Sequence, residues 1–419
     1  MAAWHSLFSE SQEAVAQDVA DLVRLDRASE QRSINLIASA AYCPRATAAF
    51  ELSHLLNRIV PGPAGRRSVS SSQSIEAIEQ MATSRARTLF DAESANVQPL
   101  SATVANVAVF RGLLNSGDSV LAFDPVAGGH VSHGGSGSAA QRDYRVHTFG
   151  TRESDGLIDV GEVRDQARRI RPRMIVVGAT SYPRQIDYKS LSEIAIETEA
   201  LFFADIAHVS GLIAAWLHEN PVPYADVATS STHKTLCGPR TGGLILCKDR
   251  IAEKISKALY PGLQGPAAAH IIAARAVLFD LVGRLEFRQL MSSVLENANA
   301  LAQGLQEAGV PLYTDGTDTH MVVADLRGPA IDHVDPLDYL AAYGIRANVV
   351  SLPARAGASG GRGIRFGTTA MTIRGLDGAQ ANEIGKLVGR LLATAPRSAV
   401  DSGISSRLAE IAEACAIPS

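Results

Sequence analysis

The chain has 419 residues, of which 46% are hydrophobic and 20% charged, and its formal net charge is −4. This length predicts two or three domains that can bury a large core. The slightly acidic balance excludes a general electrostatic attraction to nucleic acid or to an anionic membrane, so we expect neither as a partner.

The beginning of the chain and its cysteines indicate a compartment. Residues 1–23 are amphipathic and acidic and lack the basic and apolar regions of a signal peptide. No apolar run is long enough to span a membrane. The four cysteines lie in no CxxC or other metal-type spacing. We therefore expect reduced thiols, a cytoplasmic location and no metal site.

The hydrophobic pattern changes twice along the chain. Helical spacing with many charges predicts an N-terminal helical arm within residues 1–30. Helical and strand patterns alternate between about 75 and 280, which predicts βαβ units and a mostly parallel sheet covered on both faces, in a large domain of residues 31–285. Residues 286–419 predict a smaller α/β domain. The predicted helices are 74–90, 160–170, 189–200, 287–309 and a final one within 397–419, and the predicted strands are 119–123, 174–179, 201–205, 227–231, 243–247, 320–326 and 363–367.

One lysine among small hydroxyl residues points to chemistry. Lys234 lies in "VATSSTHKTLCGPRTGGLILCK" (227–248), just beyond a predicted strand, and Asp205 ends another. In an open α/β sheet, ligands bind at the carboxyl ends of the strands. A partly desolvated lysine there is a nucleophile toward aldehydes, and a nearby aspartate can pair with a protonated pyridine nitrogen. The pair fits a pyridoxal phosphate site, with the turn 99–106 as a phosphate-binding helix entry. The alternative is a surface lysine beside an unrelated strand-end aspartate.

The residues around the lysine favour the first interpretation. "THKTLCGPRTGG" resembles the lysine signature of the serine hydroxymethyltransferase family, which has the fold-type-I pyridoxal phosphate architecture. "INLIASAAY", "ANVQPLSATVAN", "GGHVSHG", "SYPRQIDY", "ADIAHVSGLIAA", "NPVPYADV", "YPGLQG" and "GIRFGTTAMTIRG" match family stretches in the same order, from about residue 12 to the C-terminus. The resemblance implies an α/β large domain with a mostly parallel seven-stranded sheet, a smaller C-terminal α/β domain, pyridoxal 5′-phosphate as cofactor, an amino-acid substrate and a homodimer with shared active sites.

The resemblance also assigns roles to individual residues. Lys234 would form the Schiff base, Asp205 would face the ring nitrogen, and His208 would approach the phenolic oxygen. His130 would stack on the ring, where a buried histidine that only satisfies a loop is the alternative. The other implied contacts are Thr180 and His233 near the cofactor, Ala102, Thr103 and the partner subunit's Gly265 at the phosphate, and Arg365 with Ser39 at the substrate carboxylate. The alternative for Arg365 is a surface ion pair.

The chain departs from the family pattern in one pocket. Ile59 and Pro61 stand where the family has a tyrosine and an essential glutamate, and Ser68 and Val69 replace a tyrosine pair. Val350 replaces an asparagine that reads the pterin, and "SAAY" (39–42) replaces "SENY". Proline can neither exchange a proton nor donate a backbone N–H. The cofactor residues remain, so the substrate is still expected to be an α-amino acid, while folate-dependent exchange is not.

Several activities remain open for such a chain. The preferred one is folate-independent Cα–Cβ cleavage of a β-hydroxy-α-amino acid, or transaldolation to an aldehyde acceptor, in a specialised pathway such as antibiotic biosynthesis. An oxygen-dependent oxidative decarboxylation, for example of a glycyl-nucleoside, is the alternative. Ordinary serine hydroxymethyltransferase activity and a non-catalytic cofactor-binding role are further alternatives.

Overall fold

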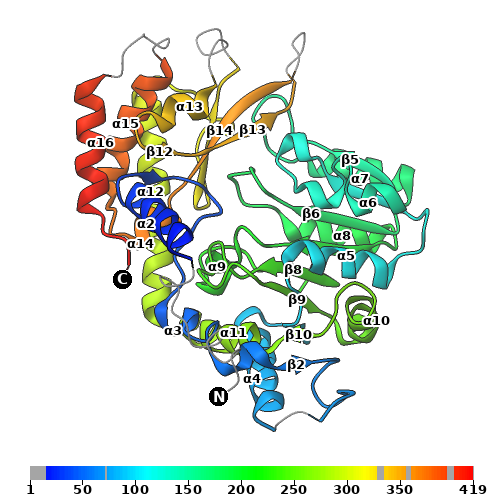
Figure 1. The fold of residues 1–419 in the computed structure, drawn as a ribbon. Helices are drawn as coiled ribbons and strands as arrows, with labels where there is room; N and C mark the ends of the chain where they lie inside the picture. The colour runs from blue at the N-terminus through cyan, green and yellow to red at the C-terminus, as the bar shows by residue number, and fades with distance from the viewer. Residues whose placement is uncertain (1–15, 71–72, 328–334, 355–359, 394–400, 419) are drawn as a thin grey trace, which may run out of the picture.

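The computed structural model describes residues 16–70, 73–327, 335–354, 360–393 and 401–418 (Figure 1). Its central feature is a seven-stranded sheet in the order β3-β9-β8-β7-β6-β4-β5. The strands are β3 Ser94–Asn96, β4 Ser119–Phe123, β5 Arg145–Phe149, β6 Met174–Gly178, β7 Leu201–Asp205, β8 Val227–Ser231 and β9 Gly243–Cys247. Only β9 runs antiparallel to its neighbours, so the mostly parallel α/β fold expected from the sequence is confirmed.

Helices cover both faces of this sheet with their apolar sides. Alternate residues along β4 point to opposite faces: Val120 joins the core under α5 and α10, while Leu121 joins the core under α4, α7, α8, α9 and α11. This double burial explains why the central strands have continuous apolar runs. The helices are α4 Gln73–Phe90, α5 Ala102–Leu113, α6 Ala139–Asp143, α7 Val160–Ile170, α8 Tyr188–Glu197, α9 Ser210–Ala214, α10 Asp249–Leu259 and α11 Ala269–Val282.

A second core forms around a three-stranded antiparallel sheet in the order β11-β14-β13. The strands are β11 Met321–Asp325, β13 Asn348–Leu352 and β14 Gly361–Gly367, and the helices are α12 Leu285–Glu307, α13 Pro336–Ala341, α14 Thr369–Ile373, α15 Gly378–Ala393 and α16 Ser402–Ala414. Helix α12 joins the two cores, since Met291 lies in the first and Leu301 in the second. Figure 1 shows the C-terminal helices on one side of the molecule and the large sheet on the other.

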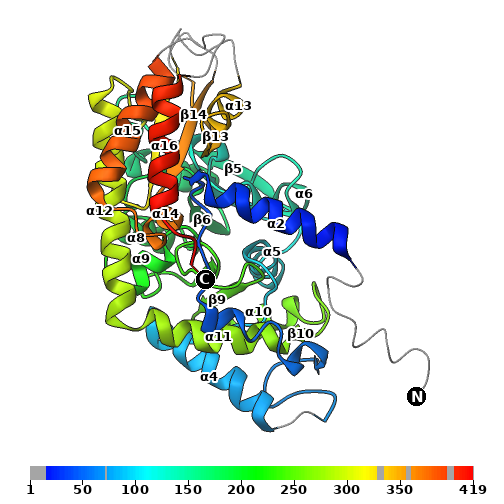
Figure 2. The ribbon, with the colours of Figure 1, turned by 60° about the vertical axis from the view of Figure 1, so that its left-hand side comes forward.

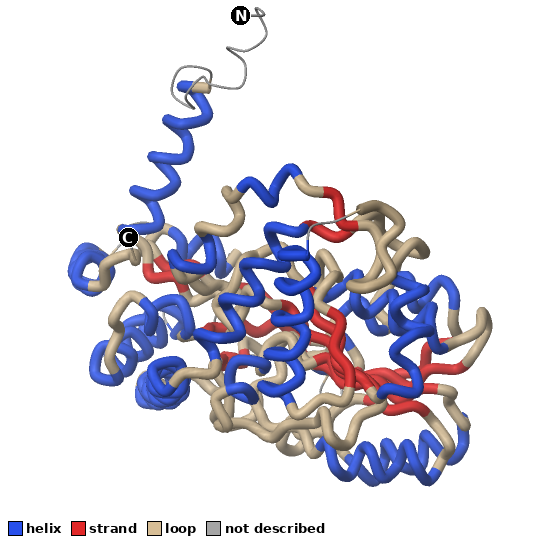
Figure 3. The backbone as a smooth tube through the Cα atoms, turned by 90° about the horizontal axis from the view of Figure 1, so that it is seen from below, coloured by secondary structure: helices blue, strands red, loops and turns tan. Residues whose placement is uncertain are grey.

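The N-terminal segments reach both cores. Helix α2 (Gln17–Gln31) buries only Ala20 and projects from the body of the molecule (Figure 3). The strand β1 (Ile34–Asn35) then pairs with β12 (Ile345–Arg346), and Ile34 and Leu36 belong to the C-terminal core. After α3 (Arg45–Ala48), β2 (Ile59–Val60) pairs with β10 (Ala267–Ala268) below the large sheet (Figure 2). The domain boundaries expected from the sequence stay a prediction. Within the described residues, no helix is both long and apolar enough to cross a membrane.

Candidate active site

The candidate site lies at the carboxyl ends of the neighbouring parallel strands β6, β7 and β8. Asp205 ends β7 and is in register with Gly178, the last residue of β6. A side chain at position 178 would lie 2.5 Å from the Asp205 Cβ and 2.8 Å from the His133 ring, so this close approach requires glycine. Lys234 follows the last residue of β8 by three positions. The structure thus places Lys234 and Asp205 at one edge of the sheet.

The hydroxyl residues around Lys234 bind the backbone of its turn. Thr235 donates a hydrogen bond from its hydroxyl to the carbonyl of His208 at 2.9 Å. The Gly238 N–H closes the turn on the Thr232 carbonyl at 2.7 Å. Both threonines are completely buried. The small side chains therefore leave room for one long side chain and fix its base, which accounts for a lysine in this setting.

The electrostatic environment makes the Lys234 amine reactive. Burial lowers the pKa of Lys234 from the ordinary value of 10.5 to about 8. Asp205 opposes this shift, and the cations of Arg365 and Arg240 reinforce it. A substantial fraction of the amine is therefore neutral near physiological pH, as a nucleophile toward an aldehyde requires.

The Asp205 carboxylate is buried and held by three donors. Its Oδ2 accepts hydrogen bonds from Asn106 Nδ2 at 2.8 Å and from His133 Nε2 at 3.1 Å, and its Oδ1 accepts from the Ala207 backbone at 3.0 Å. Burial alone would raise the pKa of this carboxyl. The hydrogen bond from His133 and the nearby positive charges outweigh burial and hold the pKa well below its usual range. Asp205 is thus an ionised group, able to keep a pyridine nitrogen protonated.

Asn106 connects Asp205 to His130. Its carboxamide oxygen accepts from the Thr229 hydroxyl at 2.5 Å, which turns its amide group toward Asp205 and toward the Ser132 hydroxyl at 3.0 Å. The Ser132 hydroxyl lies 2.7 Å from His130 Nδ1, which also accepts the Ser132 backbone N–H. One buried polar network therefore fixes both the carboxylate and the imidazole.

His208 lies on a second buried histidine. The rings of His208 and His320 stack with centroids 5.5 Å apart, and His208 Nδ1 lies 3.4 Å from His320 Nε2. His320 Nε2 also contacts the Ala38 carbonyl at 3.1 Å. Burial lowers the pKa of His320 to about 3 and that of His208 well below its ordinary value. Both rings are therefore neutral at physiological pH.

Arg365, on β14, reaches across to the large sheet. Its guanidinium donates to the Thr180 carbonyl at 2.5 Å and to Asn348 Oδ1 at 2.8 Å, and its side chain is buried. Burial lowers its pKa to about 10, so it stays cationic. A side chain at Gly367 would meet the residue before Ser39 at 2.3 Å, so the turn carrying Ser39 lies against the same strand. This arrangement excludes a surface ion pair as the role of Arg365.

The residues expected at the phosphate lie at the N-terminus of α5. Ser101 caps the helix by accepting the Val104 N–H, Ala102 is its first residue and the Thr103 side chain is exposed. Such an N-terminus offers backbone N–H groups to an anion. Gln264 of the same chain binds this entry through the Leu100 N–H at 3.2 Å. The exposed Gly265 thus follows a residue bonded to this chain's own phosphate loop, and a contribution from the partner stays a prediction.

The residues that depart from the family pattern lie mostly on one exposed edge. Ile59 is 68% exposed and Val69 47% exposed, while Pro61 is buried. Because Ile59 pairs with Ala268, this segment lies beside the strand that follows Gly265. Val350 lies on β13, two residues from Asn348. Ile59 and Val60 therefore lie beside the residues that closely follow Gly265.

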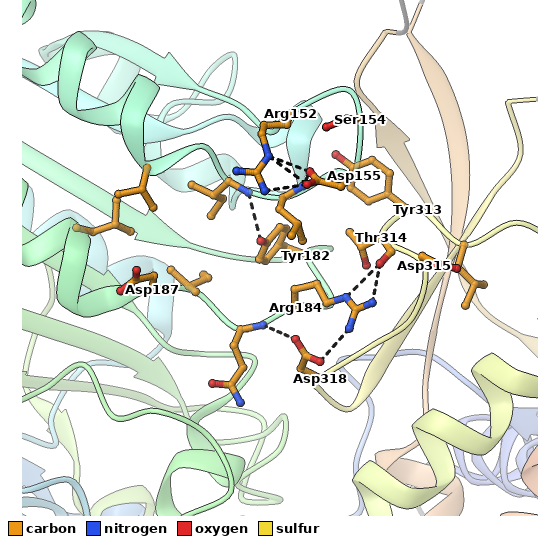
Figure 4. Close-up of a pocket in the computed structure, with 17 residues that line it drawn as sticks. Arg152, Ser154, Asp155, Tyr182, Arg184, Asp187, Tyr313, Thr314, Asp315 and Asp318 are labelled. Carbon is orange, nitrogen blue, oxygen red and sulfur yellow. Dashed lines mark hydrogen bonds and ion pairs between the residues drawn. The ribbon is translucent and has the colours of Figure 1, made fainter.

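A cavity of about 550 Å³ lies apart from these residues (Figure 4). It separates the segment 152–191 from residues 312–318, and no residue predicted for the active site lines it. Arg184 crosses it, donating to Asp318 Oδ1 at 2.9 Å and to the Thr314 carbonyl at 2.7 Å. Arg184 thus ties the two segments together, whereas Arg152 is paired with Asp155 inside the first segment.

Comparison with known proteins decides the family. The sequence model of the family described as "Serine hydroxymethyltransferase" matches residues 12–388. The serine hydroxymethyltransferases of Lacticaseibacillus casei (strain BL23) and Lacticaseibacillus paracasei (strain ATCC 334) are each 39% identical to the chain over 366 residues, which cover 87% of this chain and 89% of theirs. The chain belongs to the serine hydroxymethyltransferase family. It is a fold-type-I enzyme of the class that uses pyridoxal 5′-phosphate at an amino acid.

Buried polar atoms without partners test whether the cofactor fits. Among the described residues, Thr180 Oγ1, His233 Nδ1 and Arg365 Nε are buried and make no hydrogen bond. Buried polar groups are normally satisfied, so unpaired atoms grouped around one lysine indicate a polar ligand. We propose that Lys234, Asp205, His130, His208 and the N-terminus of α5 would hold the cofactor.

Some residues of this serine hydroxymethyltransferase-family site were missed from sequence. Asn106 and His133 lie inside two of the stretches that carry the resemblance, but nothing in the sequence links them to Asp205, which is 99 and 72 residues away. Thr229 is one of three small hydroxyl residues in a row on β8, and nothing in the sequence distinguishes it from Ser230 and Ser231. Only Asn106 gave a signal that sequence reasoning could have used, because it is a polar residue on a mostly apolar helix.

Proposed function

We propose that the chain cleaves the Cα–Cβ bond of a β-hydroxy-α-amino acid without folate, or passes the released unit to another aldehyde. Pro61 is the observation that carries the proposal, because it stands where the family has its acid-base glutamate. Ile59, Ser68 and Val69 on the same exposed edge likewise offer no carboxylate or phenol. Pyridoxal 5′-phosphate, when bound, supplies the electron sink for chemistry at Cα.

The retained residues can bind and orient such a substrate. Arg365 has an unpaired Nε beside two satisfied donors, so it can present a cationic N–H to a carboxylate. Lys234 has an amine that is partly neutral at pH 7 and can hold or release a proton at Nζ. Lys234 follows β8 and Arg365 lies on β14, so the two groups come from different sheets and can fix the substrate carboxylate relative to its reacting carbon.

His130 is suited to donate a hydrogen bond. Burial lowers its pKa to about 4, so the ring is neutral. Its Nδ1 accepts the Ser132 backbone N–H at 3.2 Å, so the remaining proton is on Nε2. A ring fixed in this tautomer can support a substrate oxygen but cannot accept the β-hydroxyl proton at Nε2. We propose that a water molecule accepts that proton.

Specific observations keep two other activities in view. The relatives at 39% identity are named serine hydroxymethyltransferases, which favours the parent reaction as the second candidate. The loss of polar side chains around positions 59–69 gives a less acidic pocket, which favours oxygen-dependent decarboxylation of a larger substrate as the third.

The deciding experiment compares substrates under matched conditions. Purified holoenzyme is given serine with tetrahydrofolate, and separately threonine, phenylserine and larger β-hydroxy amino acids without folate, each with and without oxygen. We expect aldehyde release from the larger substrates and negligible folate-dependent glycine formation, since losing one acid-base group removes about 10²- to 10⁴-fold of rate. Robust glycine formation from serine only with folate would reject the proposal. If product formation strictly requires oxygen and releases carbon dioxide, the oxygen-dependent decarboxylase would replace the proposed activity.

Two lysine variants test whether the measured activity comes from this site. Lys234→Ala should abolish every activity, whereas Lys254→Ala, an exposed lysine on α10, should leave it unchanged. Activity that survives in Lys234→Ala would show that the reaction does not use this site. No turnover of any amino acid by the wild type would favour the non-catalytic role.

We propose a homodimer with shared sites. Helix α2 exposes Leu22 and Leu25 at 67% and 66%, and the segment around Ile59 exposes further apolar side chains. Exposed apolar groups on a projecting helix are typical of an interface with another chain. The resemblance assigns the segment 57–70 and Gly265 to the partner's site, and Ile59 of this segment pairs with Ala268, three residues after Gly265.

A further inference from the structure

A buried cation beside the phosphate loop has no role in the site described above. Arg275 lies on α11 and is 1% exposed. Burial lowers its pKa to about 9, so it stays charged at neutral pH. In the part of the chain that the structure describes, no carboxylate forms an ion pair with it. A buried charge without a counter-charge is costly, so its presence requires a physical reason.

The Arg275 side chain holds the loop that leads into α5. It donates to the carbonyl oxygens of Val97 and Pro99, the latter at 2.8 Å, and Pro99 lies two residues before the helix cap Ser101. A side chain at Gly242 would lie 3.1 Å from Nη2 and 3.2 Å from Nε of Arg275, and Gly242 is itself bridged to Ser101. The guanidinium is therefore packed directly behind the entry to α5.

A second buried arginine shows what is unusual here. Arg374 is also buried, but its donors bind five backbone carbonyls, four of them at the ends of α2 and α16: those of Glu30, Gln31, Ala412 and Cys415. The C-terminus of a helix carries partial negative charge, which compensates Arg374. Arg275 instead lies beside a helix N-terminus, where the partial charge is positive, and its Nε makes no hydrogen bond. The positive charge of Arg275 and the positive end of α5 therefore lie next to each other.

We infer that Arg275 is a positioning residue for the cofactor phosphate, supplying positive charge behind the N-terminus of α5 and fixing the loop before it. The phosphate dianion would compensate both the charge of Arg275 and the positive end of α5. The Nη1 and Nη2 groups of Arg275 donate to the loop carbonyls, so we expect Arg275 to act on the phosphate from behind the loop and not by direct contact. The inference rests on the cofactor assignment made above, and it does not depend on which substrate the enzyme cleaves.

The test compares cofactors with and without a phosphate. Apoenzyme is titrated with pyridoxal 5′-phosphate and with pyridoxal. The ratio of the two dissociation constants gives the contribution of the phosphate group to binding. Arg275→Gln removes the charge and keeps one hydrogen-bonding amide. We expect it to weaken pyridoxal 5′-phosphate binding about 10- to 100-fold, the order for a charge several ångströms away at an effective dielectric constant of about 20, and pyridoxal binding less than about threefold. Equal weakening of both ligands, or none, would overturn the inference.

Two further variants separate charge from loop geometry. Arg275→Lys keeps the charge and should hold the ratio within about threefold of the wild type, so a tenfold loss would overturn the inference even where Arg275→Gln does not fold. Gln264→Ala removes hydrogen bonds to Leu100 and Gln98 of the same loop without changing charge. It should leave the ratio unchanged, and a change as large as that of Arg275→Gln would overturn the inference, because the effect would then come from the loop geometry and not from the charge. These binding measurements remain valid if the substrate proposal fails.

Discussion

The pH at which Lys234 becomes a nucleophile is set by its burial. With a pKa of about 8, roughly 9% of the amine is neutral at pH 7, against about 0.03% for a lysine with the ordinary value of 10.5, a gain of about 300-fold. Capture of an aldehyde by this amine should therefore increase about tenfold between pH 7 and pH 9 and then level off. An unperturbed lysine would increase about 100-fold over the same interval and continue upward.

The assay follows capture at this one residue. Apoenzyme is incubated briefly with pyridoxal over a pH series, the adduct is reduced with borohydride, and the modified peptide is quantified by mass spectrometry. Pyridoxal avoids the phosphate, whose own ionisation would obscure the profile. A rate that continues to increase beyond pH 10 without a plateau would refute the reasoning about burial.

An exposed arginine allows the pKa of Lys234 to be altered without disturbing the core. Arg240 lies six residues after Lys234, and its charge contributes to lowering that pKa. Arg240→Gln should move the plateau to higher pH and reduce capture at pH 7, whereas Arg87→Gln, on the remote helix α4, should leave the profile unchanged. A shift in the opposite direction would show that Arg240 acts by geometry and not by charge.

Three further results are expected. Asp205→Asn turns an amide N–H toward one of the three donors that bind the carboxylate, so we expect the free energy of unfolding of the apoenzyme to fall by about 1–3 kcal/mol in urea titrations at pH 7. Because the folded pKa is depressed, that contribution is fully present above the unfolded pKa of about 3.9 and falls progressively as the pH drops from there toward the folded pKa, so the difference between variant and wild type should shrink in acid, and an undiminished difference at pH 3 would contradict this. Arg365→Lys cannot form a forked contact and should raise KM for the amino acid more than about tenfold in steady-state kinetics; an unchanged KM would remove Arg365 from the carboxylate site. Leu22→Asp with Leu25→Asp should give monomers by light scattering, and an unchanged mass would place the interface elsewhere.

The sequence predicted the parts of the sheet that are buried on both faces. The strands 119–123, 201–205, 227–231 and 243–247 are continuous apolar or small-residue runs between amphipathic helices, and they are confirmed at these bounds. Strand β5 was missed because it is the edge strand, and its exposed residues give no apolar run. Helix α11 was missed because it is apolar on all sides, which removes the helical period from its pattern.

Some residues of the site could likewise be identified from the sequence, and others could not. Lys234 and Asp205 could be identified because strand ends collect function and because each lies in a distinctive local pattern. The link from Asn106 through Ser132 to His130 could not, because it joins residues whose proximity exists only after the sheet has formed. The sequence left open whether His130 or water handles the β-hydroxyl proton, and the hydrogen bond of His130 to the Ser132 backbone, which leaves Nε2 as a donor, favours water.

The charges of the site suit its ligands. Burial removes the charge from the neighbouring histidines, lowering the pKa values of His130 and His233 to about 4. The permanent charges near Lys234 then include the Asp205 carboxylate and the cations Arg365 and Arg240, with Arg275 behind the entry to α5 and Lys234 between the neutral and charged forms. In the proposed arrangement the anion faces the ring nitrogen, and the cations lie toward the substrate carboxylate and the phosphate. None of the replacements at positions 59, 61, 68 and 69 removes these charges, so the proposed chemistry at Cα is compatible with the proposed loss of the folate reaction.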